Sequence, residues 1–156
     1  VGSKLIAYNT DIIGFEQSFT PLLKPTHNKA LVLGTGGASK AVQYVLNRLE
    51  ILFKVVTRSA PVNNTSINYS DIDDVLMDEY RIIINCTPVG MWPNESTAPE
   101  LPYHLISNEH YLYDLVYKPA KTIFLQKGEE RGAMVKNGND MLLIQAEASW
   151  KIWNSD

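Results

Sequence analysis

A glycine-rich turn between an apolar strand and an amphipathic helix constrains the fold of this chain more than any other feature. The short apolar run at residues 29–33 is typical of a buried strand, and Gly34-Thr35-Gly36-Gly37-Ala38-Ser39 follows it. Apolar side chains recur at helical spacing over residues 40–49, and the β-branched run at 53–57 predicts the next strand. A strand, a turn, a helix and a second strand in this order predict a right-handed parallel crossover.

The remaining periodic segments repeat this alternation along the chain. Strand patterns cover residues 81–85, 111–117 and 133–135, and helical patterns cover residues 70–80, 122–131 and 139–154. Ser70 is the expected N-cap of the first of these helices. The alternation predicts an α/β fold, a doubly wound parallel sheet of the Rossmann type with helices on both faces. A further helix over residues 11–23 is expected to dock on this sheet from outside.

Composition narrows the class of protein. The chain has 156 residues, enough for one domain, and no apolar run approaches the roughly 18–20 residues that a membrane span needs. Its 14 Lys and Arg against 17 Asp and Glu leave a formal charge of −3, which gives no basic excess for a nucleic-acid partner. Cys86 is the only cysteine, which suits a cytoplasmic protein and excludes an internal disulfide. The three histidines lack ligand spacing, so no metal site is predicted.

The glycine turn has the chemistry of a dinucleotide-binding loop. Such a loop needs a tight turn after a strand, backbone that can approach a pyrophosphate closely, and helix N-terminal N–H groups that point at the anion. Gly34, Gly36 and Gly37 meet these needs. Ala38 follows them, and Ser39 takes the third small position of the motif, where Gly or Ala is usual. The alternative is a glycine turn with a purely structural role.

The residues after the second strand bear on which dinucleotide binds. An acidic residue there would bond the ribose 2′-hydroxyl of NAD, whereas an Arg would accept the 2′-phosphate of NADP. The sequence offers Thr57-Arg58-Ser59 and no acid before Asp71, so we expect Thr57 and Arg58 to contact the phosphate of NADP. The alternative is that Arg58 is a solvated surface charge.

A second polar motif, Asn9-Thr10-Asp11, stands at the start of the first expected helix. Asp11 could simply cap this helix, because Asp and Thr near a helix start satisfy unpaired backbone N–H groups. A catalytic role for Asp11 would need a partner base. The residues alone leave both interpretations open.

Five blocks, in order along nearly the whole chain, resemble the shikimate dehydrogenase family, including its quinate/shikimate relatives. The blocks are Tyr8-Asn9-Thr10-Asp11 with Gly14-Phe15, the glycine turn, Ile84-Asn85-Cys86-Thr87-Pro88-Val89-Gly90-Met91, Tyr113-Asp114-Leu115-Val116-Tyr117-Lys118-Pro119, and Asn137-Gly138 leading to Met141-Leu142-Leu143-Ile144-Gln145-Ala146. The resemblance implies an oxidoreductase of aromatic amino-acid (chorismate) biosynthesis, which converts 3-dehydroshikimate to shikimate with NADPH by reversible hydride transfer.

The resemblance also implies roles for single residues. Asp11 would be the carboxylate of a catalytic Lys–Asp pair, and Tyr117 and Gln145 would contact substrate hydroxyls. Leu115 and Gly138 would lie on the nicotinamide side, and Thr87 would lie over the pyrophosphate. The full set of implied cofactor contacts is Gly34, Gly36, Gly37, Ala38, Ser39, Thr57, Arg58, Thr87, Leu115, Gly138 and Met141.

The family's catalytic Lys and its grip on the substrate carboxylate belong to an N-terminal domain that precedes the Asn-Thr-Asp motif. We therefore expect residues 1–23 to form a junction to such a domain, residues 24–156 to form the dinucleotide-binding domain, and this chain alone to be inactive. Lys4 stands too close to Asp11 to replace the catalytic Lys. The family's NADP clamp often has a second Arg, which does not follow Arg58, so NAD stays open as the cofactor.

Two other functions remain open, a stand-alone non-catalytic dinucleotide-binding module and a quinate/shikimate-type paralogue that uses NAD. An uncovered apolar face over residues 5–23 would favour self-association. Among the remaining side chains, we expect Cys86 to be a small buried residue without catalytic function. We also expect Trp92, Trp150 and Trp153 to pack against the rest of the protein.

Overall fold

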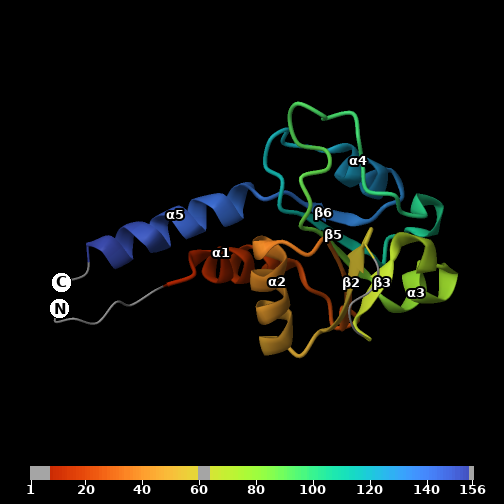
Figure 1. Cartoon of the computed structure of the whole chain (residues 1–156), viewed down its shortest axis with the longest axis horizontal. Helices are drawn as coiled ribbons and strands as arrows, with labels where there is room; N and C mark the ends of the chain where they lie inside the picture. Colours follow the sequence, from red (N-terminus) through yellow and green to blue (C-terminus); the bar gives the residue numbers. More distant parts are fainter. Residues whose placement is uncertain (1–7, 60–63, 155–156) are drawn as a thin grey trace.

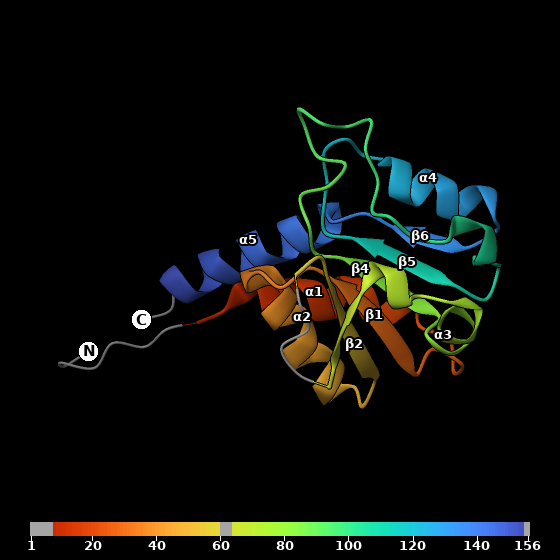
Figure 2. The same ribbon diagram turned by 45° about the vertical axis from the view of Figure 1, so that its right-hand side comes forward.

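A parallel sheet forms the centre of the molecule. The computed structural model describes residues 8–59 and 64–154. Within these residues the sheet has six strands in the order β3-β2-β1-β4-β5-β6, and every neighbouring pair is parallel (Figure 1, Figure 2). The strands are β1 (Lys29–Leu33), β2 (Leu52–Thr57), β3 (Ser66–Asn68), β4 (Ile82–Asn85), β5 (Tyr111–Asp114) and β6 (Met134–Lys136). This is the strand order of the doubly wound fold, which confirms the predicted fold class.

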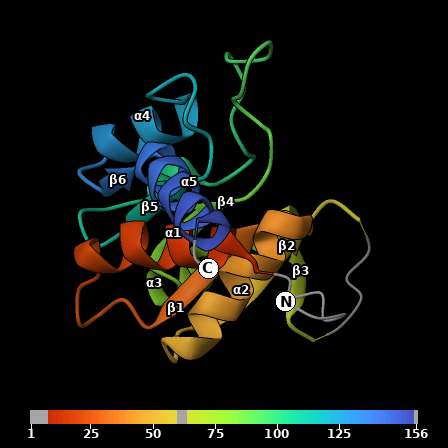
Figure 3. The ribbon, with the colours of Figure 1, turned by 90° about the vertical axis from the view of Figure 1, so that its left-hand side faces the viewer.

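Helices cover both faces of the sheet. One face carries α1 (Thr10–Phe19), α2 (Gly37–Arg48) and α5 (Asn139–Trp153), and the other carries α3 (Asp74–Glu79) and α4 (Ile123–Glu130) (Figure 3). A short 3₁₀ helix, η3 (Tyr103–Leu105), lies beside α3. None of the described helices combines the length and the apolar character that a membrane crossing requires.

The side chains of β1 alternate between the two faces. Ala30 and Val32 join the core under α1, α2 and α5, whereas Leu31 and Leu33 join the core under α3 and α4. Because the strand is buried on both faces, each of its positions from Ala30 onward must be apolar. This explains why the sequence shows a continuous apolar run here instead of an alternating one.

Aromatic side chains anchor α1 to the sheet. The rings of Phe15 and Phe19, both fully buried, stack with centroids 4.8 Å apart, and Phe19 also stacks on Tyr111 of β5 at 5.3 Å. The helix docks on the sheet as predicted but ends at Phe19. Because Pro21 has no N–H to continue the helical ladder, a 3₁₀ helix, η1 (Thr20–Leu22), follows.

The helix expected at residues 70–80 is divided in two. A 3₁₀ helix, η2 (Tyr69–Asp71), precedes α3, and the N-cap of α3 is Asp73, not Ser70. The Asp73 carboxylate accepts a hydrogen bond from the Leu76 N–H at 2.9 Å. The expected N-cap is therefore wrong, because an acid at the true helix start supplies the acceptor.

The ends of the sheet also differ from the sequence pattern. The strand expected at residues 111–117 ends at Asp114, because the Asp114 carboxylate accepts the Val116 N–H at 3.0 Å and turns the chain. The sequence did not predict β3, which has three residues and ends in a polar one, Asn68. Ile67 is the only apolar residue of β3, so the strand carries no apolar pattern that could be recognised, whereas the equally short β6 contains Met134 and Val135.

The three tryptophans are exposed, so the expectation that they pack is wrong. Trp92 is 70% exposed, Trp150 is 67% exposed and Trp153 is 80% exposed. α5 extends past the rest of the molecule (Figure 1), and Trp150 and Trp153 stand in its last turns. Within residues 8–59 and 64–154, no surface covers the tryptophans in the last turns of α5.

Candidate functional site

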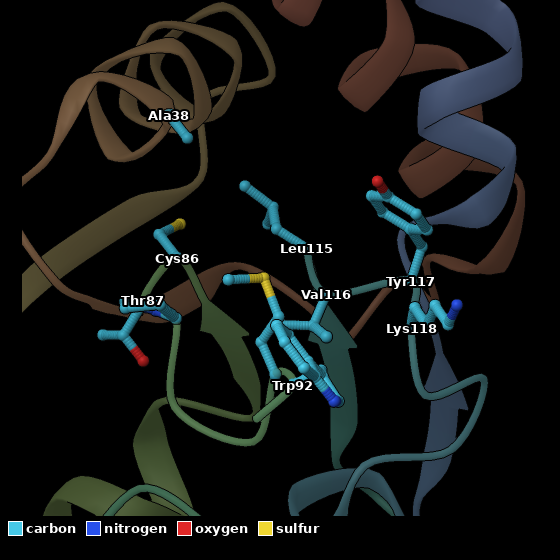
Figure 4. A pocket seen from close by; sticks show the side chains of 10 residues that line it. Ala38, Cys86, Thr87, Trp92, Leu115, Val116, Tyr117 and Lys118 are labelled. Atoms are coloured by element: carbon cyan, nitrogen blue, oxygen red, sulfur yellow. The ribbon is translucent and has the colours of Figure 1, made fainter. Parts of the chain in front are cut away.

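Two cavities lie next to each other at the carboxyl ends of the central strands. The first holds about 480 Å³ and is lined by Ala38, Cys86, Thr87, Pro88, Met91, Trp92, Leu115, Val116, Tyr117 and Lys118 (Figure 4). The second holds about 260 Å³ and is lined by Gly34, Thr35, Gly36, Val56, Thr57, Arg58, Ser59, Tyr69, Cys86, Thr87 and Pro88. Because three residues line both cavities, they form the two halves of one elongated site. In doubly wound sheets, ligands bind at this edge.

The glycines of the turn have two different physical explanations. Gly34 has a φ of +99°, and a Cβ there would lie 2.9 Å from Thr87 Cγ2, so the turn itself requires glycine. At Gly36 and Gly37, an added Cβ would meet no heavy atom within 4 Å. Protein packing does not explain these two glycines, whereas a ligand that approaches the backbone closely would.

α2 begins at this open part of the turn. Gly36 is its N-cap and offers no side-chain acceptor, so the first N–H groups of the helix have no side-chain partner. Ala38 lines the first cavity. Ser39 is fully buried and accepts a hydrogen bond from Gln43 Nε2 at 3.0 Å. The Ser39 side chain thus faces the protein interior, and only its backbone belongs to the site.

The turn after β2 lines the second cavity. Thr57 and Arg58, the predicted phosphate contacts, both lie here, and the Ser59 N–H donates to Thr57 Oγ1 at 3.1 Å. Arg58 is exposed and forms no ion pair within residues 8–59 and 64–154. A guanidinium without a carboxylate partner, next to an open helix N-terminus, suits an anionic ligand.

A buried hydrogen-bond network holds the two loops that form the walls of the first cavity. The Asn85 side chain donates to Asp114 Oδ1 at 3.0 Å and accepts from Thr87 Oγ1 at 2.6 Å. Thr122 Oγ1 donates to Asp114 Oδ2 at 2.6 Å. Sequence reasoning assigned no role to this network. Its signal was a polar residue at the end of each of two apolar strands, Asn85 and Asp114, which pair in register.

Burial shifts the ionisation of two groups at the site. It raises the pKa of Asp114 to about 6, and the hydrogen bonds from Thr122, Val116 and Asn85 oppose this shift only in part. Burial also raises the pKa of the Cys86 thiol. Cys86 is half-buried and lines both cavities as a neutral thiol.

The loop after β5 carries two of the predicted contacts, Leu115 and Tyr117, into the first cavity. Figure 4 shows Tyr117 on the side of the cavity nearest the α5 ribbon, and Trp92 in front of Val116. Sequence reasoning gave no site role to six other residues that line this cavity, and all but Trp92 stand in the blocks that resemble the family. They are Cys86, Pro88, Met91, Trp92, Val116 and Lys118.

Two predicted cofactor contacts, Gly138 and Met141, pack against other residues of the protein. A Cβ on Gly138 would lie 2.1 Å from the Leu115 carbonyl oxygen, and the Gly138 N–H donates to Val116 O at 3.2 Å. Met141 is buried in the core, where its carbonyl oxygen would lie 2.7 Å from a Cβ on Gly14. The structure places neither residue in the lining of the two cavities.

Asp11 lies in the first turn of α1 and is half-buried. The alternative that it caps this helix is wrong, because Asn9 is the N-cap and its Oδ1 accepts the Asp11 N–H at 3.1 Å. Gln145 lies on α5, where its Cβ would be 3.2 Å from a Cβ on Gly14. Asp11 and Gln145 therefore belong to the same packed helix pair, and neither lines the two cavities.

Two buried histidines are held by backbone groups. His27 Nδ1 accepts from the Lys24 N–H at 3.1 Å and His110 Nδ1 accepts from the Ser107 N–H at 3.1 Å. Burial lowers the pKa of both imidazoles, so they are neutral at pH 7. In the described part of the chain, no three His, Cys, Asp or Glu side chains form a group that could hold a metal ion.

Curated proteins are similar in sequence to this chain over nearly its whole length. No family model matches it. The shikimate dehydrogenase (NADP(+)) of Caldicellulosiruptor saccharolyticus is 36% identical over 164 residues, which cover 97% of this chain and 59% of that protein. The chain thus spans less than two thirds of the length of this relative.

Solved structures agree with this match. The chorismate mutase/shikimate 5-dehydrogenase fusion protein of Clostridium acetobutylicum has a TM-score of 0.79 and 34% identity, over 94% of this chain and 54% of that chain. The shikimate 5-dehydrogenase of Thermus thermophilus, solved in complex with NADP(H) and shikimate, has a TM-score of 0.79 and 29% identity, over 99% and 59% of the two chains. By sequence and by fold, the chain is similar to shikimate dehydrogenases over 54–59% of their length.

Proposed function

We propose that this chain binds NADP(H) across the two cavities and forms the cofactor-binding part of an enzyme that interconverts 3-dehydroshikimate and shikimate. The observation that carries the proposal is the open backbone of Gly36 and Gly37 at the start of α2, where a Cβ would meet no protein atom. The relative from Thermus thermophilus, solved with NADP(H) and shikimate, supports both the cofactor and the substrate.

The residues fit the parts of the dinucleotide. The unpaired N–H groups at the start of α2 would bind the pyrophosphate, as helix N-termini do in this fold. Thr57 and Arg58 in the second cavity would bind the 2′-phosphate of the adenosine half. The first cavity would take the nicotinamide half, where Leu115 and the other apolar side chains exclude water.

The bound cofactor would supply the reaction with a hydride acceptor and donor at nicotinamide C4. Tyr117 and Gln145 would orient the substrate through hydrogen bonds to its hydroxyls. The Asp11 carboxylate, which no capping role occupies, would orient a Lys side chain whose neutral amine takes the hydroxyl proton as shikimate is oxidised and whose ammonium returns it in the reverse direction. We propose that this Lys belongs to a further domain and that the chain alone does not oxidise shikimate.

Calorimetric titration with NADP⁺ and NAD⁺ tests the proposal. We expect NADP⁺ to bind more tightly, and Arg58→Gln to weaken NADP⁺ binding about tenfold while NAD⁺ binding stays unchanged. Arg131→Gln is the matched control, because Arg131 is exposed and lines neither cavity. Absence of binding by both dinucleotides at millimolar concentration would refute the proposal.

Two further results would redirect the assignment. A preference for NAD⁺ would favour the quinate/shikimate-type alternative, for which the single Arg in the second cavity is the supporting observation. Oxidation of shikimate by this chain alone would refute the need for a Lys from another domain.

We also propose the division expected from the sequence, with residues 1–23 as a junction and residues 24–156 as the dinucleotide-binding domain. Supporting it, Ile13 of α1 lines a groove of about 300 Å³ between α1 and α5.

We also propose that the chain self-associates. Exposed apolar surface on α5 favours this, and it is contributed by Leu143, Trp150 and Trp153. Sedimentation that shows a monomer at every concentration would contradict this self-association.

A further inference from the structure

Asn68, the last residue of β3, uses its whole side-chain amide to hold the turn that carries Arg58. Asn68 pairs in parallel register with Thr57. Two carbonyl oxygens face one end of its amide and require the amide nitrogen there; in this assigned orientation the nitrogen donates to the Thr57 carbonyl oxygen at 3.0 Å and to the Ser59 carbonyl oxygen at 3.1 Å. The amide oxygen accepts from the Asp71 N–H in the capping box of η2. Both donors and an acceptor of the amide are therefore used.

The two carbonyls that Asn68 holds stand on either side of Arg58. The Ser59 N–H adds a third hydrogen bond, to Thr57 Oγ1 at 3.1 Å. The backbone on both sides of Arg58 is therefore fixed, while the guanidinium itself is exposed in the second cavity and has no ion-pair partner among the described residues. A long cationic side chain on a fixed backbone loses less conformational freedom when it binds an anion.

We propose that Asn68 is a positioning residue that sets the preference for a 2′-phosphorylated adenosine by fixing the backbone around Arg58. This inference rests on the proposed NADP site and adds to it a residue that does not touch the ligand. Its effect is confined to the 2′-phosphate, because Asn68 acts through Arg58 and is not among the residues that line either cavity.

The two functions of the Asn68 amide can be separated by substitution. Ser is as good an N-cap as Asn, so Asn68→Ser keeps an acceptor for the Asp71 N–H. The short Ser hydroxyl cannot donate to the two carbonyls that the Asn68 amide reaches. Asn68→Ser therefore removes the positioning function and leaves the cap and the charge unchanged.

The test uses adenosine 2′,5′-bisphosphate and 5′-AMP as probes, titrated calorimetrically into the whole chain. We expect Asn68→Ser to weaken binding of the bisphosphate about five- to tenfold and to leave 5′-AMP within about twofold. Asn28→Ser is the matched control, because Asn28 is exposed at the opposite end of the sheet, before β1. It should leave both affinities unchanged.

A double-mutant cycle with Arg58→Gln keeps the proposal testable if the single variant is unstable. In the Arg58→Gln background, Asn68→Ser should change the ratio of the two affinities much less, since the charged group that Asn68 positions is gone. An equal loss of both probes in Asn68→Ser, or no loss of the bisphosphate, overturns this inference and leaves the NADP site standing. A wild-type chain that binds neither probe overturns the NADP site itself.

Discussion

The side-chain amide of Asn85 donates a hydrogen bond of 3.0 Å to the Asp114 carboxylate, and both residues are fully buried at the ends of neighbouring strands. The contact ties the loop after β4 to the loop after β5, which together form most of the first cavity. A carboxylate buried in this way resists ionisation, because desolvation penalises its charged form. Its pKa of about 6 therefore couples the stability of the cavity walls to pH.

Compared with an Asp114→Asn variant, the wild-type chain should be more stable in acid than at neutral pH. Its pKa is about 6 in the folded protein against 3.8 for the free side chain. This raised pKa stabilises the fold fully below about pH 4, and the stabilisation is lost as pH rises through 6. The free energy of unfolding of wild type minus that of Asp114→Asn should fall by about 2–3 kcal/mol between pH 4 and pH 7. Urea unfolding at each pH measures it, and a difference that does not change with pH would contradict the prediction.

Gly138→Ala should destabilise the fold. The added Cβ would lie 2.1 Å from the Leu115 carbonyl oxygen, which is backbone and cannot move aside cheaply. We expect the free energy of unfolding to fall by about 2–3 kcal/mol in urea titrations. Gly37→Ala is the control, since a Cβ there meets nothing within 4 Å and Ala favours the helix, so its stability should change by less than about 1 kcal/mol. Equal losses of stability in the two variants would contradict a clash between the added Cβ and the Leu115 carbonyl oxygen.

Cys86 should react slowly with iodoacetamide. Its raised thiol pKa leaves less thiolate at any pH near neutrality, and the thiolate is the reactive form. We expect alkylation at pH 7.5 to be at least about tenfold slower than for the urea-unfolded chain, to accelerate with pH, and to slow further when NADP⁺ is added. Mass spectrometry follows the reaction. A native rate equal to the unfolded rate would contradict the burial of this thiol.

Trp92 should report ligand binding by fluorescence. In the variant Trp150→Phe/Trp153→Phe, Trp92 is the only remaining tryptophan, and its exposure predicts efficient quenching by acrylamide. Because Trp92 lines the first cavity, NADP⁺ should reduce this quenching. The complementary variant Trp92→Phe should show quenching that NADP⁺ leaves unchanged. Loss of the NADP⁺ effect in the first variant would place the nicotinamide half outside this cavity.

The fold could be predicted from the sequence because its central strands are buried on both faces. A strand such as β1 must be apolar from Ala30 onward, and the glycine turn after it marks where the chain enters α2. The edge strand β3 contains a single apolar residue, Ile67, and was missed. The break at η2 was also missed, because Asp73 and Ser70 are both acceptable caps and only tertiary packing selects between them.

The site was predictable where a residue type is required by its own chemistry. Gly36 and Arg58 could be found in this way and line the second cavity, whereas Gly37, the first residue of α2, lines neither cavity. The contacts that depend on packing could not be found from the sequence. Asn68 reaches its partners through strand pairing, and the exposure of Trp92 depends on how a long loop folds.

Thr87 lines both cavities, and its methyl group and its hydroxyl each contact other residues. A Cβ on Gly34 would lie 2.9 Å from the Thr87 methyl, while the hydroxyl donates to Asn85 and through it reaches Asp114. Together with Cys86 and Pro88, which also line both cavities, Thr87 separates the two halves of the site, and it lies between the glycine turn and the residues that hold the buried carboxylate. A change of charge at Asp114 would therefore alter the contacts of a bound dinucleotide at its adenosine end and at its nicotinamide end at the same time.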